Sequence, residues 1–451
     1  MVFVWLAPNR GGDIVRAVQK CTDPDRNDQG TAIGCSNNTG VEIGMLPRTE
    51  DGRSGFQMCN LSEINGSYCT TPERFYEACV AGAILGTLQA GYSNFTYLTQ
   101  ATQDIVDREA LIGVSITGWM NNPDVLFDEE VMRTGAELVK SVNLQVARMI
   151  GINPAARTTC VKPSGNASVL LGTASGIHGE HAPRYFRNVQ MNAADRVCEL
   201  IEERNPSLVE VSVWNPNGTD KVISFPVISK PGSIYKQDLL GVKQLEFVKK
   251  AQQHWVEYGT NEHLCTHPKL RHNVSNTITV DDWDEVEQYI YDNRTWFAGI
   301  SLLAAAGDRA YPQAPFTEVL TRQEITGLYG DASLLASGLI VDGLHAFNGN
   351  LWQACDTVQG TGLKLTPYGS HDLLKRDWVR RTNNLAVNYF QGDTQTAVNC
   401  LKDVFNFHKW KTVEREMKEI NFAQELGQQS YTDVTTMGAQ ACSGGVCELT
   451  F

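Results

Sequence analysis

Residues 160–192 read CVKPSGNASVLLGTASGIHGEHAPRYFRNVQMN, and they say more about the fold than any other stretch of the chain. The apolar, β-branched lead-in from Thr158 to Val161 predicts a strand over 157–162. A turn of small residues follows, Pro163-Ser164-Gly165-Asn166-Ala167-Ser168, and then the apolar run Val169-Leu170-Leu171, which predicts a helix. The order strand, small-residue turn and helix is typical of α/β proteins.

The turn has the chemistry of a phosphate site. A small-residue turn that opens a helix exposes backbone N–H groups and the positive end of the helix dipole. Ser164, Asn166 and Ser168 add side-chain donors without crowding an anion. The turn matches neither the Gly-x-x-x-x-Gly-Lys loop nor the Gly-x-Gly-x-x-Gly loop. Taken alone, such a turn begins an ordinary helix more often than it binds phosphate, so both interpretations stay open at this point.

Helical and strand patterns alternate along most of the chain. One helix is predicted over 128–150, because Asp128 can cap its start and Gly151 can end it. Alternation of this kind favours βα units around a parallel sheet. Residues 1–58 lack periodicity, 316–423 are predicted to be mostly helical, and a polar tail begins near 424. The other predicted helices are 72–90, 193–204, 239–258 and 282–294, and the other predicted strands are 221–228, 272–280 and 297–304.

Composition limits the class of protein. The 451 residues are 42% hydrophobic and 20% charged, which is ordinary for a globular protein with a sizeable core. The net charge of −13, with no local excess of Lys and Arg, argues against a surface that binds nucleic acid. The chain has no run of 18 apolar residues, and no basic region precedes its short apolar start. We therefore expect neither a membrane span nor a signal peptide, and a reducing, cytosolic location.

Five further stretches, read together with 160–192, resemble one family in the same order along the chain. The segment 160–192 is similar to the phosphate-binding segment of ribonucleotide reductase large subunits, in the form typical of adenosylcobalamin-dependent (class II) and phage enzymes. There the pattern reads roughly KPSGTAS-LLG-SSGIH, followed by PRY-R. The other similar stretches are Val41–Met45, Cys59–Asn65, Asn273–Thr277, Phe297–Leu303 and Cys442–Cys447.

The resemblance implies a ten-stranded α/β barrel, made of two half-barrels around a finger loop. This chain begins just before the stretch that matches the finger loop. It is therefore expected to contain the second half-barrel plus the finger loop, a helical C-terminal region and a flexible tail. The expected parts are 1–58, the N-terminal segment and finger loop; 59–423, the catalytic half-barrel with the helical region; and 424–451, a redox-active tail.

The finger-loop motif of the family, Asn-x-Cys-x-Glu, matches Asn38-Thr39-Gly40-Val41-Glu42. The resemblance implies that Asn38 hydrogen-bonds the substrate hydroxyls and that Glu42 is the general base. The radical cysteine is replaced by Gly40, and glycine cannot hold a thiyl radical. A gene split, a degenerate copy and a deliberate substitution all remain open, and Cys35 could serve only if the loop changed register.

The resemblance also assigns the thiols and the substrate. Cys59 is implied to be one of two substrate-reducing cysteines, with its partner on the first half-barrel. Cys442 and Cys447 flank a short Ser-Gly-Gly-Val spacer in the tail, where exposed thiols can exchange with a buried disulfide. Thioredoxin or glutaredoxin would then reduce this pair. The turn Pro163–Ser168 is implied to hold the phosphates of a ribonucleoside di- or triphosphate.

The absence of an adjacent tyrosine pair indicates the source of the radical. Members that take the radical from a separate metal-containing subunit use an adjacent Tyr-Tyr pair, and no two tyrosines are adjacent in this sequence. Adenosylcobalamin is therefore the expected cofactor, with a separate metal-containing subunit as the alternative. Two rival functions remain: one subunit of a split reductase whose partner chain supplies the first half-barrel, or an inactive relative that still binds nucleotides. If the chain is virus-encoded, it would act in the host cytoplasm.

One other motif suggests metal chemistry. His263, Cys265 and His267 stand two residues apart and could begin a zinc site. No CxxC or HxxxH motif elsewhere completes the set, so we expect no metal site.

Overall fold

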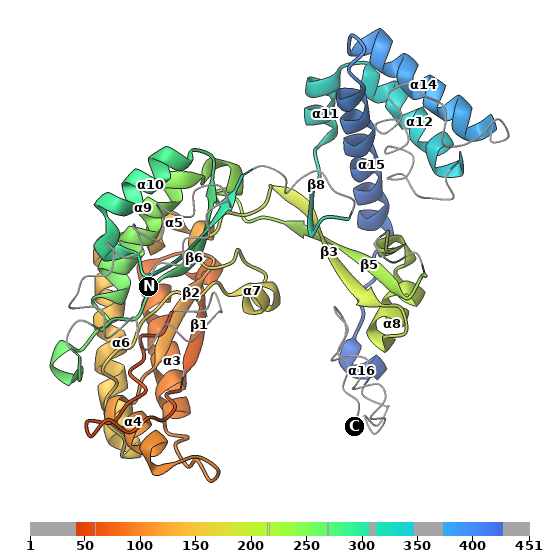
Figure 1. Cartoon of the computed structure of the whole chain (residues 1–451). Coiled ribbons are helices and arrows are strands. Elements are labelled where there is room, and N and C mark those ends of the chain that lie inside the picture. The colour runs from red at the N-terminus through yellow and green to blue at the C-terminus, as the bar shows by residue number, and fades with distance from the viewer. Residues whose placement is uncertain are drawn as a thin grey trace. The chain divides into compact units, whose positions relative to one another are not determined.

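The computed structural model describes residues 42–58, 60–213, 215, 217–267, 270–305, 313–346 and 373–426 (Figure 1). They form two compact units that alternate along the chain. The described residues of unit 1 fall within Met1–His181 and Ser229–Gly307. Those of unit 2 fall within Ala182–Ile228 and Asp308–Phe451. The three-part division predicted at residues 58 and 423 stays a prediction.

Unit 1 is built on a parallel sheet. Strand β1 (Leu61–Asn65) pairs in parallel with β2 (Gly113–Thr117), and β6 (Ser275–Val280) pairs in parallel with β7 (Gly299–Ala304). The segment 157–161 joins the two pairs through parallel bridges from Val114 to Thr159 and from Val161 to Val274. The order across the described part of the sheet is therefore β1, β2, 157–161, β6 and β7, which is a parallel α/β arrangement.

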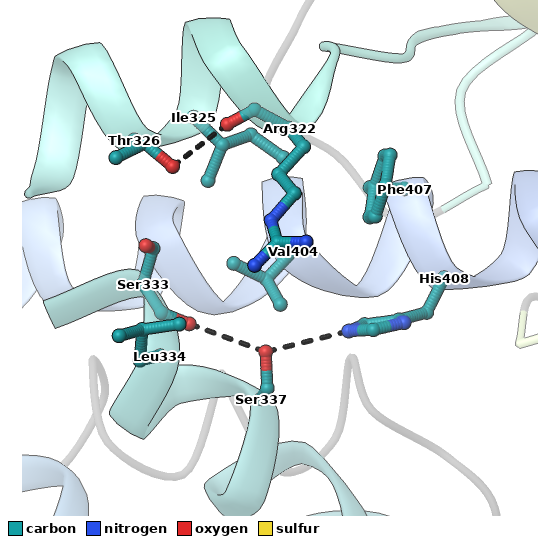
Figure 2. Close-up of a pocket in the computed structure, with 9 residues that line it drawn as sticks. All are labelled: Arg322, Ile325, Thr326, Ser333, Leu334, Ser337, Val404, Phe407 and His408. Atoms are coloured by element: carbon teal, nitrogen blue, oxygen red, sulfur yellow. Dashed lines mark hydrogen bonds between the residues drawn. The ribbon is translucent and has the colours of Figure 1, made fainter. Parts of the chain in front are cut away.

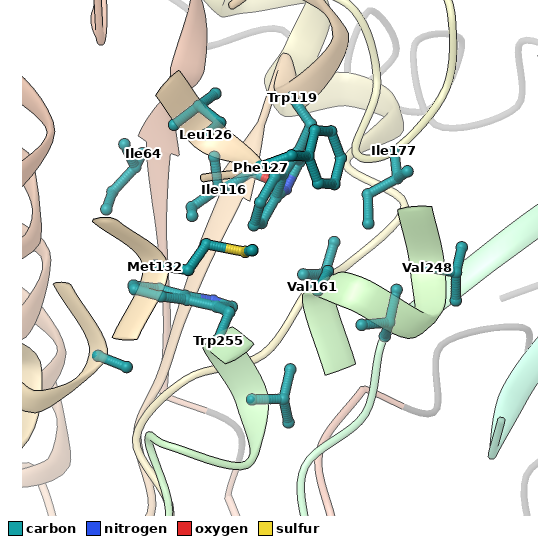
Figure 3. Packing of buried hydrophobic residues seen from close by; sticks show 14 of the residues in the cluster. Ile64, Ile116, Trp119, Leu126, Phe127, Met132, Val161, Ile177, Val248 and Trp255 are labelled. Atoms are coloured by element: carbon teal, nitrogen blue, oxygen red, sulfur yellow. The ribbon is translucent and has the colours of Figure 1, made fainter. Parts of the chain in front are cut away.

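Helices cover one face of this sheet, and the core of unit 1 lies between the sheet and these helices. Ile64, Val114, Ile116, Val161 and Ile278 are buried in this core. Figure 3 shows two tryptophans, Trp119 and Trp255, among the apolar side chains. Each indole N–H is satisfied, because it donates to the carbonyl of Ile116 at 2.9 Å and of Cys160 at 3.1 Å respectively. The helices of unit 1 are α3 (Pro72–Ala90), α4 (Gln100–Glu109), α5 (Pro123–Leu126), α6 (Glu129–Ile150), α7 (Gly165–Leu171), α9 (Gly241–Ala251) with a π-helical turn at Gln252–Val256, and α10 (Trp283–Asp292).

The predicted caps of the long helix α6 are confirmed. The Asp128 carboxylate accepts from the backbone N–H of Val131 at 2.9 Å. Gly151 ends the helix with a φ of +77°, in the left-handed region that glycine adopts without strain. The predicted bounds of α3 are also confirmed, whereas α4 was not predicted.

Unit 2 departs from the parallel arrangement that the sequence predicted. Its sheet is antiparallel, in the order β4 (Val209–Val211), β5 (Asp220–Ile228), β3 (Arg184–Asn192) and β8 (Phe316–Glu318). The predicted parallel sheet is therefore found in unit 1 and does not extend to unit 2. The reason is that a helix at Arg196–Arg204 leads from β3 to β4, and the hairpin from β4 to β5 then places β5 between them, antiparallel to both. The helices of unit 2 are α8 (Arg196–Arg204), α11 (Arg322–Tyr329), α12 (Ala332–Ala346), α14 (Leu373–Tyr389), α15 (Thr394–Glu416) and α16 (Phe422–Leu426).

The predicted α/β class is confirmed by these two units together. The parallel sheet of unit 1 is what a half-barrel requires. Most of the expected finger loop lies outside the described residues. Within the described ranges, no helix has both the length and the hydropathy needed to cross a membrane.

Candidate functional site

The polar face of the parallel sheet lies opposite its helices. Successive side chains of a strand point to opposite faces. Since Ile64 and Val114 are buried against the helices, their neighbours Glu63 and Ser115 point to the other face. Lys162 follows the segment 157–161 and reaches the same face. These three residues come from three adjacent segments of the sheet: Glu63 and Ser115 lie at the middle of β1 and β2, and Lys162 lies just after the segment 157–161.

Direct contacts connect the three polar side chains. Ser115 Oγ donates to Glu63 Oε1 at 3.2 Å and accepts from the backbone N–H of Lys162 at 3.0 Å. Lys162 Nζ lies 3.5 Å from Glu63 Oε2. Glu63 is only partly exposed, and burial raises the pKa of its carboxyl, while Lys162, Ser164 and Ser115 oppose that rise. The site therefore holds one carboxylate next to one ammonium group.

Glu42 brings a second carboxylate to the site. Its backbone carbonyl accepts from the N–H of Asn273 at 2.8 Å, which ties it to the start of β6. The side chain is buried, and its Oε2 atom has no hydrogen-bond partner. Burial raises the pKa of Glu42, and its own backbone N–H and the charge of Lys162 only partly counter this. A buried carboxyl with a raised pKa takes up a proton more readily than an exposed one.

The residues after Glu42 run across the amino-terminal part of the same face. Ile43 packs on Cys160 and Leu111 in a small apolar cluster. Gly113 makes room for this contact, because a Cβ atom there would lie 2.8 Å from Ile43 Cδ1 and 3.0 Å from Cys160 Sγ. The backbone N–H of Gly44 donates to His272 Nδ1 at 3.1 Å. The stretch that contains Glu42 is thus held against the sheet by packing and by hydrogen bonds.

The predicted phosphate turn begins α7 at the carboxyl ends of the strands. Asn65 Nδ2, at the end of β1, donates to the carbonyl of Leu171 at 2.9 Å. Thr117 Oγ1, at the end of β2, donates to the carbonyl of Ala174 at 2.8 Å. Ser164 precedes the helix with a φ of +55°, a left-handed conformation that is uncommon for residues other than glycine. Two adjacent strands therefore fix the position of this strained turn.

The sequence predicted that the side chains of the turn are free to donate hydrogen bonds to an anion, but the two serines are not exposed. Ser164 and Ser168 are buried. Ser168 Oγ hydrogen-bonds the carbonyl of Gly165 at 2.9 Å and the hydroxyl of Ser175 at 2.8 Å. Gly165 is exposed, and the N–H groups of a first helical turn have no acceptor within the helix. The backbone of the turn, rather than its serine hydroxyls, is therefore the part available to an anion.

Of the predicted site residues, the structure brings Glu42 and the turn Pro163–Ser168 to one sheet. At Asn166 the structure describes the backbone of the turn only. The other predicted residues lie outside the described part of the chain: Asn38, Gly40, Cys59, Cys442 and Cys447. Their roles stay predictions.

Sequence analysis missed Glu63, Ser115 and Lys162 as site residues. A signal was present only in β2, where GVSIT alternates apolar and polar residues and so predicts one apolar and one polar face. In β1, LSEIN places Ser62 and Glu63 side by side and does not alternate. The two strands are far apart in the sequence, however, and only their parallel pairing places Glu63 opposite Ser115.

The motif around Cys265 has a structural role. Arg157 and Glu109 form a fully buried ion pair at 2.6 Å, and Arg157 also lies 3.6 Å from Cys265 Sγ. Gln57 Nε2 donates to the same carboxylate at 3.1 Å, which connects the segment before Cys59 to this pair. In the described ranges, no group of three or more His, Cys, Asp or Glu side chains is arranged to hold a metal ion.

Comparisons with known proteins find similar chains among ribonucleotide reductases. No family model matches the chain. An adenosylcobalamin-dependent ribonucleoside-triphosphate reductase of Euglena gracilis is 23% identical over 251 residues, which cover 53% of this chain and 32% of the relative. One of Lactobacillus acidophilus is 26% identical over 197 residues, covering 36% and 26% respectively. A solved B12-dependent (class II) ribonucleotide reductase has a TM-score of 0.49 and 16% identity, over 60% of this chain and 40% of that one.

The fold and the site define an α/β protein with a cluster of charged and polar side chains on one face of a parallel sheet. The curated relatives confirm the predicted resemblance to adenosylcobalamin-dependent ribonucleotide reductases. The chain spans about a third or less of the length of the curated relatives that it matches.

Proposed function

We propose that this chain forms the catalytic half of a ribonucleotide reductase, which reduces ribonucleotides to 2′-deoxyribonucleotides for DNA synthesis. One observation carries the proposal: the buried Glu42 carboxyl feels the charge of Lys162, which pairs with Glu63 and directly precedes the turn Pro163–Ser168. A general base beside a phosphate-type turn is what binding and deprotonating a nucleotide require. The names of the relatives favour triphosphates over diphosphates as substrates.

In this proposal Glu42 accepts the proton of the ribose 3′-hydroxyl. Its raised pKa makes it a stronger base than an exposed glutamate, and Lys162 limits the cost of its charge. The N–H groups of the first turn of α7 hold the phosphates, and Asn38 orients the ribose hydroxyls. Each role follows from chemistry that the residue type can perform.

Hydrogen abstraction is the step that this chain does not supply at the matched position. Gly40 has no side chain, and the thiol of Cys160, which is on the same sheet face, is buried beneath Ile43. Adenosylcobalamin provides a radical in reductases that use it, but Gly40 and the buried Cys160 offer no thiol to accept that radical. This observation favours a second candidate function, in which a partner chain supplies the cysteine that accepts the radical.

The electrons would come from thiols outside the described residues. Cys59 and a cysteine of the partner half would reduce the substrate. Cys442 and Cys447 would restore them by disulfide exchange, and thioredoxin or glutaredoxin would restore the tail. These reactions require the reducing conditions of a cytoplasm, either of the cell or of a virus-infected host.

The test is a reduction assay with the four ribonucleoside triphosphates, adenosylcobalamin and a dithiol. We expect no product from the wild type and product from Gly40→Cys, in which the added dithiol takes the place of the cysteine of the partner half. Gly40→Ser is a size-matched control that stays inactive. Product from the wild type would contradict the assignment of Gly40 and move the radical to another thiol, such as Cys35. No product from any variant would contradict a self-sufficient catalytic half and favour the partner-chain function.

A further inference from the structure

A cavity of about 270 Å³ opens among three helices of unit 2. It lies between α11, α12 and α15, all of which belong to unit 2 (Figure 2). The volume is slightly below the roughly 300–1,000 Å³ typical of pockets for drug-sized ligands. The cavity therefore suits a smaller molecule.

One side of the cavity is apolar. Ile325 from α11 and Val404 from α15 are buried members of the helical core of unit 2. Phe407, one turn further along α15, packs against the same core. These three side chains offer a compact surface on which a small hydrocarbon group would be removed from water.

A positive charge stands over this surface. Figure 2 shows Arg322 extending from α11 into the space in front of Val404. The guanidinium of Arg322 makes no ion pair with a described acidic residue. Two nearby carboxylates are already engaged, because Glu324 pairs with Arg184 at 3.0 Å and Asp403 accepts from the Tyr329 hydroxyl at 2.6 Å. The charge of the pocket is therefore not neutralised by the surrounding described side chains.

Polar groups complete the opposite side. Ser337 Oγ donates to the carbonyl of Ser333 at 3.2 Å and lies 3.3 Å from His408 Nε2. Since the serine proton goes to the carbonyl, this network makes His408 the donor to Ser337. Convergent polar groups at the edge of an apolar surface are the usual composition of a small-molecule site.

We propose that this pocket binds a small organic anion, namely a carboxylate attached to a compact apolar body. The carboxylate forms a paired hydrogen bond with the planar guanidinium of Arg322. The apolar body rests on Ile325, Val404 and Phe407. An inorganic anion would leave the apolar surface exposed, and a neutral analogue would leave the arginine without a counter-charge. The site is independent of the proposed reductase function.

Isothermal titration calorimetry with the full chain tests this site, with benzoate as the probe. We expect benzoate to bind, and to bind at least tenfold more tightly than benzamide, acetate or inorganic phosphate. Arg322→Gln should weaken benzoate binding at least tenfold and leave benzamide binding unchanged. Arg415→Gln is the matched control, because Arg415 is an exposed arginine on α15 that pairs with Glu416 outside the pocket. It should bind benzoate as the wild type does.

Three results would overturn the proposal. They are no benzoate binding, benzoate binding no tighter than that of acetate, and equal benzoate affinity in Arg322→Gln and the wild type. Because Arg322 is exposed, its replacement does not disturb the core, so a loss of binding reports on the pocket. No nucleotide enters the experiment, so its failure leaves the reductase proposal untouched.

Discussion

Glu42 and Glu63 depend on a single ammonium group, that of Lys162. Burial raises the pKa of both carboxyls, and the charge of Lys162 lowers both. The charge of Lys162 therefore counters the burial of both carboxyls without cancelling it. A carboxyl with a raised pKa takes up a proton more readily than an exposed glutamate, which suits Glu42 to the proposed proton transfer.

At the phosphate turn, Gly165 gives a direct test of anion binding. A Cβ atom at Gly165 would have no neighbour within 4 Å, so a side chain fits there. Gly165→Asp would place a negative charge at the start of α7, where it suits the helix dipole but repels a phosphate. We expect the affinity for ribonucleoside triphosphates to fall at least tenfold, as measured by equilibrium dialysis.

Gly165→Asn is the matched control for that substitution, because its side chain has the same shape without the charge. Its affinity should stay within about threefold of the wild type, which corresponds to roughly 0.6 kcal/mol. Equal losses in the two variants would show that size, not charge, matters at this turn. Unchanged binding in both would remove the turn from the phosphate site.

Among the elements, those with local signals could be predicted from the sequence. Helix α6 has an Asp cap and a terminal glycine within its own residues, and its bounds were predicted correctly. The sequence of β3 contains nothing that indicates which strands it pairs with. It pairs with β5 and with β8, and Phe316 of β8 is more than 120 residues from its partner Arg187. Strand direction depends on these distant contacts, so local patterns could not give it.

The candidate site was predictable only in part for the same reason. Glu42 and the turn Pro163–Ser168 were predicted because each belongs to a contiguous motif. Glu63 and Lys162 belong to different segments, and their contact depends on the order of strands in the sheet. The burial that raises the pKa of Glu42 comes likewise from distant residues, so it could not be predicted either.

His272 connects the stretch after Glu42 to the residue that precedes β2, and it makes this connection sensitive to pH. Its Nδ1 atom accepts from Gly44, and its Nε2 atom donates to the carbonyl of Ile112 at 2.8 Å. Burial, together with the charge of Arg157, lowers the pKa of His272 from 6.5 to about 3. The folded protein therefore holds it neutral, whereas the unfolded chain protonates it below about pH 6.5. Stability is fully present above that pH and is lost as the pH falls.

We expect the contribution of His272 to the free energy of unfolding to drop by about 1 kcal/mol between pH 6.5 and 5.5. Urea unfolding of the wild type and His272→Gln, followed by tryptophan fluorescence, would measure it as the difference between the two pH slopes. His263→Gln, at an exposed histidine, is the control and should keep the wild-type slope. The same slope in His272→Gln would contradict a buried, neutral His272.

At the scale of the whole molecule, two units with separate cores share one chain. The core of unit 1 lies between its parallel sheet and helices, whereas unit 2 has a helical cluster and a second cluster against its antiparallel sheet. Units with their own cores can open separately, and stability then differs between them. The candidate reductase site belongs to unit 1, and the anion pocket belongs to unit 2. Loss of one site therefore need not accompany loss of the other.

Leu401→Ala tests this independence. Leu401 is fully buried in the helical core of unit 2, so its truncation should cost about 2–5 kcal/mol there. Hydrogen exchange measured peptide by peptide should show reduced protection in α12 and α15 and unchanged protection in β2 of unit 1. Leu328→Ala, at a side chain that is 64% exposed, should change neither unit by more than about 0.5 kcal/mol. If β2 lost as much protection as α15, the two units would unfold as one, and the sites of the chain would be linked through its stability.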